Sequence, residues 1–262
     1  MSNYVNHSFH LVDESPWPFK SALGAFFLTT GLVEWFWSRA WLLIFLGVSL
    51  LLLIILQWWR DISFEATFQG LHRGGVELGL RWGMALFIIS EIFFFLSFFW
   101  AFFHRSLRAA VELGNHWPPA GVKTFNPWQV PLLNTLILLR SGVTVTWAHH
   151  ALISGNHKET TAGLFWTVLL GIYFTGLQAL EYFEASFSIA DRVFGRTFFI
   201  ATGFHGLHVL VGTTFLLMCL IRTVKAHIRP LHHFGLEAAA WYWHFVDVVW
   251  LFLFTTIYWW GG

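Results

Sequence analysis

The sequence is poor in charge and in cysteine. Only 11% of its 262 residues are Asp, Glu, Lys or Arg, whereas a soluble domain carries about 25%. Because 15 Lys and Arg nearly cancel 14 Asp and Glu, the chain lacks the basic excess of a nucleic-acid-binding protein. The single cysteine, Cys219, excludes an intrachain disulfide and any zinc site built on several cysteines.

Apolar residues dominate the rest of the composition. Hydrophobic residues make up 56% of the chain and aromatic residues 20%, which excludes intrinsic disorder and indicates that water is not the main solvent. The first residues lack the basic start and small-residue cleavage site of a secretory peptide and the Arg-rich character of a transit peptide. We therefore expect the protein to keep its N-terminus and to insert into a membrane through its own first helix.

Long apolar runs give the expected architecture. A hydrocarbon core of about 30 Å requires about 20 apolar residues in a helix, and the sequence has seven runs near that length. Unpaired backbone groups are costly in lipid and the runs lack the alternation of barrel strands, so each run predicts a helix. The fold class is therefore an all-α polytopic membrane protein with seven transmembrane helices. The runs are 21–37, 40–59, 82–103, 128–153, 162–183, 198–221 and 238–260.

The breaks between the runs are too short to form a soluble domain, so the chain is expected to be a single membrane domain over residues 1–262. The loops on the side of the N-terminus carry slightly more Lys and Arg than those on the other side. Positive residues concentrate on the inner side of a membrane, which predicts an inner N-terminus.

Glu91 is the clearest candidate for a functional side chain. It is the tenth residue of the run 82–103, close to the midplane, where an ionised carboxylate is very costly. We expect it to be protonated and to face other helices or a bound lipid. Glu91 is either a proton-relay carboxylate or an element of a lipid and gas path, or it is a neutral acid hydrogen-bonded inside the bundle. A relay needs a chain of partners, and the same run supplies no second acid near Glu91.

Histidines are numerous, and imidazole is the commonest transition-metal ligand. His205 and His208 lie one helical turn apart, whereas the adjacent His149 and His150 diverge on a helix. Spacing alone favours interhelical hydrogen bonding over metal binding for these residues. His244 and Asp247 share a helix face and could pair, and a structural role is favoured for both.

The break after residue 59 places aromatic, cationic and hydrogen-bonding groups at headgroup depth. It contains Trp58, Trp59, Glu65 and His72, and Arg222 ends a later run on the same predicted side. Such a group suits a phospholipid phosphate and its glycerol. Ordinary interfacial anchoring and snorkelling explain it equally well.

Several motifs in a fixed order resemble subunit III of the haem–copper cytochrome c oxidases over nearly the whole chain. They include WWRD at 58–61, TFQG at 67–70, FIISE at 87–91, ATGFHGLHV at 201–209 and WYWHFVDVVWLF at 241–252. The resemblance implies that the first two helices (about 21–59) lean away from the other five (about 82–260), which leaves a cleft filled by phospholipid. The uncleaved start and short loops resemble the mitochondrial form, which implies the inner membrane with the N-terminus on the matrix side; the alternative is a bacterial cytoplasmic membrane.

The resemblance also implies a role. The subunit carries no haem or metal, packs against subunit I, which holds the haem–copper site, and supports proton uptake. Carried over by position, Glu91 is the family's buried carboxylate. The lipid contacts would be Trp58, Trp59, Glu65, His72 and Arg222.

A different class of protein remains an alternative from the residues alone. A transporter or channel could use Glu91 as an intramembrane ion or proton carrier. A secondary transporter should show paired halves with interrupted helices, and the seven unpaired runs argue against it.

Overall fold

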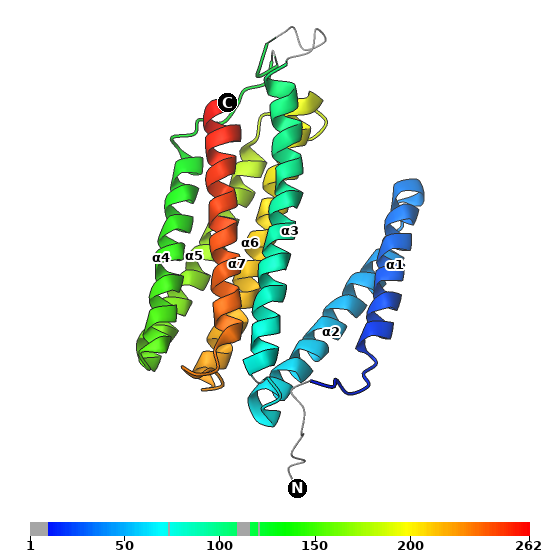
Figure 1. The fold of residues 1–262 in the computed structure, drawn as a ribbon. Helices are drawn as coiled ribbons and strands as arrows, with labels where there is room; N and C mark the ends of the chain where they lie inside the picture. Colours follow the sequence, from blue (N-terminus) through cyan, green and yellow to red (C-terminus); the bar gives the residue numbers. More distant parts are fainter. Residues whose placement is uncertain (1–9, 73, 109–115, 120) are drawn as a thin grey trace. The chain divides into compact units, whose positions relative to one another are not determined.

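The computed structural model describes residues 10–72, 74–108, 116–119 and 121–262, and most of these residues lie in α-helices (Figure 1). π-Helical segments continue two of them, η1 (Glu65–Gln69) after α2 and η3 (Phe254–Trp260) after α7. The all-helical fold class is confirmed for the described part of the chain. The helices are α1 (Trp17–Ser38), α2 (Leu42–Phe64), α3 (Gly74–Ser106), α4 (Val130–Ile153), α5 (His157–Glu184), α6 (Arg192–Val224) and α7 (Phe234–Leu253).

Each predicted run falls within a helix or overlaps one, but among the described residues six helical segments, not seven, are long and apolar enough to cross a membrane. The exception is α1. It carries Lys20, Thr29, Thr30 and Glu34 among its apolar residues, which lowers its mean hydropathy. Its length of 22 residues still corresponds to about 33 Å of helix.

The chain divides into two compact units, Met1–Leu80 and Arg81–Gly262. In the first unit, α1 and α2 run side by side as a hairpin (Figure 1). Arg39, with a φ of 58°, ends α1, and its N–H donates to the carbonyl of Trp35. Glycines allow the two helices to touch, because a Cβ added to Gly31 would lie 2.5 Å from the backbone nitrogen of Ile44.

The second unit has its core around α7. Neighbouring helices α4 and α5, α5 and α6, and α6 and α7 pack together, and α4 also packs on α7. Trp243 and Trp250 on α7 are fully buried. Indole N–H groups need partners when buried, and here they donate to hydroxyls of α4, from Trp243 to Ser141 at 2.8 Å and from Trp250 to Thr135 at 2.9 Å.

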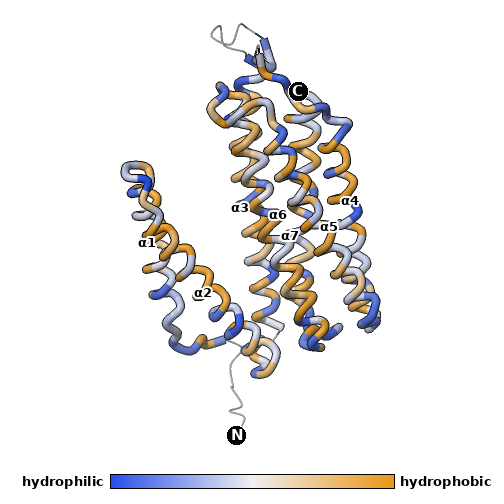
Figure 2. The backbone as a smooth tube through the Cα atoms, turned by 180° about the vertical axis from the view of Figure 1, so that it is seen from behind, coloured by the Kyte–Doolittle hydropathy of each residue, from blue (hydrophilic) through white to orange (hydrophobic). Residues whose placement is uncertain are grey.

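The start of α3 is tied to the start of α7 by an ion pair. Arg81 Nε and Nη2 both donate to Glu237 Oε2, at 3.1 and 3.0 Å. Along the helices of this unit hydrophobic residues predominate, and hydrophilic residues gather at the helix ends (Figure 2). A core of interdigitated apolar and aromatic side chains thus surrounds a small number of polar pairs.

Candidate functional site

Glu91 on α3 meets His208 on α6 near the middle of both helices. Its Oε2 lies 2.9 Å from His208 Nε2. The two side chains are 22% and 11% exposed, respectively. The sequence suggested Glu91 as a buried acid and His208 as an interhelical hydrogen-bonding residue, but it gave no reason to pair them.

The other ring nitrogen of His208 determines how many protons the pair holds. Nδ1 lies 2.6 Å from the carbonyl oxygen of Phe204, and a carbonyl only accepts, so Nδ1 carries a hydrogen. Nε2 then either accepts from a protonated Glu91 or, as part of an imidazolium, donates to a carboxylate. In both states one proton lies between the two side chains.

The surroundings of the pair favour its neutral state. The ring of Phe95 lies 4.9 Å from that of His208, and Tyr242 stacks on His208 at 6.2 Å. Taking two opposite charges out of water costs more than their attraction returns unless further hydrogen bonds support them. We therefore expect a protonated Glu91 that donates to a neutral His208, which agrees with the expectation from its depth.

An infrared measurement tests this protonation state. Glu91→Gln should remove a carbonyl stretching band of a protonated carboxylic acid from the spectrum of the purified protein at neutral pH. Glu237→Gln is the matched control and should leave that band in place, because two guanidinium nitrogens of Arg81 donate to Glu237 Oε2 and a guanidinium is the usual partner of a carboxylate. A Glu91→Gln difference spectrum without the band would mean that the pair is an ion pair.

The other histidines in the predicted set make separate contacts. His205 is fully buried, and its Nε2 donates to the carbonyl of Val246 on α7 at 3.2 Å. The ring of His149 lies 5.4 Å from that of His233. Among the described residues, His149 Nε2 and His205 Nδ1 have no hydrogen-bond partner.

His244 and Asp247 on α7 lie close to each other and to α4. His244 Nδ1 is 3.8 Å from Asp247 Oδ2, and His244 Nε2 is 3.2 Å from the hydroxyl of Thr146. Asp247 packs onto Gly142, where a Cβ would lie 2.6 Å from its Oδ2. These contacts join α7 to α4 through polar groups.

A second carboxylate is buried on α5. Glu181 on α5 is 2% exposed, and the hydroxyl of Tyr258 donates to its Oε1 at 2.6 Å. Gln178 Nε2 in turn lies 3.4 Å from the Tyr258 oxygen. Glu181 is therefore better enclosed than Glu91, and its burial depends on a tyrosine 77 residues away, which the sequence could not indicate.

Arg140 is a residue that the sequence analysis missed. It lies inside the run 128–153 and is exposed on α4. A charge at the centre of an apolar run is itself a functional signal, so the sequence alone contained the information needed to find it.

Two of the predicted lipid contacts, Trp58 and Trp59, lie in the last turns of α2. Trp59 is 52% exposed and Trp58 is partly buried. Trp17, at the start of α1, donates from Nε1 to Asp61 Oδ2 at 2.9 Å. This bond fixes the start of α1 to the end of α2, where the tryptophans lie.

Glu65, His72 and the additional residue His10 gather just beyond these tryptophans. Gly70, with a φ of 63°, ends η1 and donates its N–H to the carbonyl of Glu65, which turns the chain so that His72 returns toward Glu65. His10 Nε2 lies 3.8 Å from Glu65 Oε2, and the rings of His10 and His72 are 5.8 Å apart. The sequence gave no indication of His10, because nothing places the N-terminal segment beside α2.

This three-residue cluster has ligand types that metals use. One ligand atom from each residue lies within 4.8 Å of the other two. The absence of a metal from this chain stays a prediction.

The fifth predicted lipid contact, Arg222, belongs to the second unit. It lies in the last turn of α6, and a Cβ added to Gly235 would be 3.3 Å from its Nη1. Arg222 thus packs on the start of α7. Four of the predicted lipid contacts fall within Met1–Leu80 and one within Arg81–Gly262.

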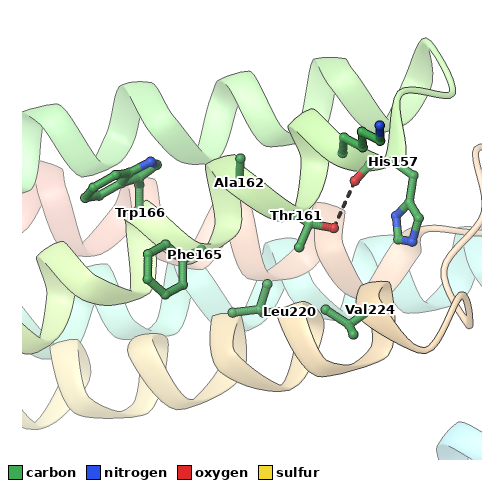
Figure 3. Close-up of a pocket in the computed structure, with 8 residues that line it drawn as sticks. His157, Thr161, Ala162, Phe165, Trp166, Leu220 and Val224 are labelled. Atoms are coloured by element: carbon green, nitrogen blue, oxygen red, sulfur yellow. Dashed lines mark hydrogen bonds between the residues drawn. The ribbon is translucent and has the colours of Figure 1, made fainter.

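An open, mostly apolar hollow lies between the start of α5 and the end of α6 (Figure 3). At its polar edge, the Thr161 hydroxyl already donates a hydrogen bond within α5, to the His157 carbonyl at 2.9 Å. It contains none of the predicted site residues. Its lining consists of His157, Lys158, Thr161, Ala162, Phe165, Trp166, Leu220 and Val224.

Long apolar helices that pair their few buried carboxylates with imidazoles and hydroxyls define a polytopic membrane protein. The family model "Cytochrome c oxidase subunit III" matches residues 7–262. The chain belongs to this family, and the resemblance of its motifs is confirmed.

Curated relatives named cytochrome c oxidase subunit 3 match the chain over nearly its full length. The protein of Anopheles gambiae is 65% identical and that of Drosophila melanogaster 64% identical, each over 100% of both chains. The protein of the fish Scyliorhinus canicula is 61% identical over 98% of both. The chain is therefore a core subunit of cytochrome c oxidase, an oxidoreductase complex, and the alternative of a separate transporter or channel is set aside.

Proposed function

We propose that the chain serves its oxidase as a non-redox subunit that packs against subunit I, holds phospholipid and supports proton uptake. Haem and copper would then lie in the partner subunits. The observation that carries the lipid part is the convergence of His10, Glu65 and His72 beside Trp58 and Trp59 within one unit.

The chemistry of this convergence suits a lipid headgroup. Indole rings prefer headgroup depth, and the imidazoles supply hydrogen bonds to phosphate and glycerol oxygens. Glu65 can accept from glycerol hydroxyls or from an amine headgroup. The side chains of His10 and Glu65 are 15% and 27% exposed, so they are accessible to a ligand without being fully solvated.

The same groups support a role in proton uptake. Imidazole changes its charge near neutral pH, so two imidazoles beside a carboxylate at the membrane surface can collect protons for a neighbouring subunit. Glu91, in contrast, lies in the middle of α3 and is hydrogen-bonded to His208, which supports a structural or lipid-facing role for this buried carboxylate.

The wider setting is part of the proposal. The helix pair α1 and α2 would lean away from the five helices α3 to α7 within one membrane domain, with phospholipid in the cleft between them. The membrane would be the mitochondrial inner membrane with the N-terminus on the matrix side; residues 1–9 lie outside the described part of the chain.

A lipid-retention experiment tests the proposal. In the purified oxidase complex, His72→Ala should lower the phospholipid retained per haem after a fixed detergent wash, because it removes a headgroup hydrogen bond. Glu65→Ala should act in the same direction. Oxygen-reduction activity should also decline faster during turnover, because the lipid supports subunit I. Mass spectrometry of the extracted lipid and oxygen consumption over time provide the two measurements.

The matched control is His116→Ala, which changes an exposed histidine of the second unit. It should leave both lipid content and activity decay unchanged. Equal lipid retention in wild type and His72→Ala would contradict the lipid site, whereas failure of the wild-type chain to purify with haem-bearing subunits would contradict the function itself.

A further inference from the structure

We propose that the outward face of α4 around Arg140 is covered, in the assembled oxidase, by a membrane-spanning helix of another subunit that carries an acidic side chain at the same depth. The inference rests on the chain's membership of the oxidase complex, which supplies partner subunits within the membrane. The positive charge of Arg140 on this face indicates that the partner is acidic.

Arg140 lies deep in the span. It is the eleventh residue of α4 (Val130–Ile153), which has 24 residues. At a rise of about 1.5 Å per residue, its Cα is about 15 Å from the start of a helix about 36 Å long. That depth is the middle of the hydrocarbon core.

Its neighbours on the helix show that it points outward. Leu136, Val143 and Trp147 precede or follow it by four, three and seven residues, so they share its face, and they are 57%, 69% and 40% exposed. Arg140 is itself exposed. Within the described part of the chain, no ion pair or hydrogen bond of its side chain is found.

A guanidinium in this position needs a partner that the lipid cannot provide. It stays protonated in proteins, and a charge at the bilayer centre is rare and almost always faces a protein interior or a water-filled cavity. Side chains on a helix lean toward its N-terminus, so Arg140 reaches over the exposed, apolar Leu136, still well below the headgroups. A carboxylate offers the bidentate geometry that a guanidinium fits.

A second polar group on the neighbouring helix supports the same conclusion. His244 is the eleventh residue of α7, and its side chain is 46% exposed. It is bonded to Thr146 on α4 at 3.2 Å. α4 and α7 thus each expose a polar group near the middle of the span, Arg140 and His244, and such groups suit contact with protein better than contact with acyl chains.

Cross-linking in the intact complex tests the proposal. The only cysteine, Cys219, is buried, so Val143→Cys places a single accessible thiol in this chain, one turn from Arg140. A maleimide carrying a benzophenone is attached there, the complex is illuminated, and the adducts are identified by mass spectrometry. We expect adducts with a membrane-spanning peptide of another subunit that contains Asp or Glu.

Variants at Arg140 make the role of the charge measurable. In the Val143→Cys background, Arg140→Leu should lower the cross-linking yield roughly tenfold, the change expected when one member of a buried ion pair is removed. Arg140→Lys should retain most of the yield. Leu136→Ala is the matched control, because it changes an apolar neighbour and keeps the charge.

Three results would overturn the proposal. They are adducts with phospholipid alone, adducts with peptides of this same chain, and a yield that Arg140→Leu leaves unchanged. If the chain still purifies with haem-bearing subunits in these cases, its place in the oxidase stands and only the interface is wrong.

Discussion

Trp243→Ala is expected to cost the second unit about 3–5 kcal/mol of stability, the range for removing a buried large side chain. Trp243 is fully buried on α7, and its ring fills the space left by two glycines. A Cβ at Gly171 or Gly212 would lie 2.9 or 2.8 Å from ring atoms of Trp243, so α5 and α6 approach α7 through this side chain. Removal of the indole ring leaves a cavity. It also leaves the Ser141 hydroxyl without the N–H donor of Trp243.

The measurement is the temperature at which the chain is released from, or unfolds within, the purified complex. Trp241→Ala is the matched control, because the same residue type on the same helix is 36% exposed and leaves no closed cavity. It should shift that temperature little. Equal shifts for the two variants would mean that Trp243 is not a central packing residue.

Gly31→Val is expected to separate α1 from α2. A Cβ at Gly31 would lie 2.5 Å from the nitrogen of Ile44, and one at Gly47 would lie 2.5 Å from the nitrogen of Leu28. The obstacles are backbone atoms, which cannot change rotamer, so the helices must move apart. Overpacking of a tight contact costs about 1–3 kcal/mol, a large fraction of the packing in a two-helix hairpin.

Hydrogen exchange followed by mass spectrometry checks this result in the purified complex, with faster exchange expected across α1 and α2. Gly79→Val is the control in the same unit, because a Cβ there meets nothing within 4 Å. Unchanged exchange in Gly31→Val would show that the hairpin does not depend on close contact at this glycine.

The positions of the helices could be predicted because lipid imposes a simple requirement on the backbone and on composition. The ends of the helices could not be predicted, because charged and polar residues continue a helix into the headgroup region. α3 begins at Gly74 and α2 continues to Phe64, although the apolar runs begin at 82 and end at 59. The break expected between them is therefore mostly helical.

The candidate site was predictable only residue by residue. Depth in a run identified Glu91, but its partner His208 is 117 residues away, and no periodicity within one helix relates the two. His10 joins Glu65 only through the hairpin that places α1 beside α2. Such cross-helix contacts depend on tertiary packing, which one sequence does not contain explicitly.

The bond from His208 Nδ1 to the carbonyl of Phe204, in the same helix, has a consequence for motion. A histidine that relays protons must either rotate its ring or use its two nitrogens in turn. Here Nδ1 is hydrogen-bonded to a carbonyl of the preceding helical turn. The hydrogen bonds at both ring nitrogens therefore favour one orientation of the imidazole. Transfer of a proton from Glu91 through His208 would first have to break the bond to Phe204, so this histidine is a less direct carrier than a freely turning imidazole.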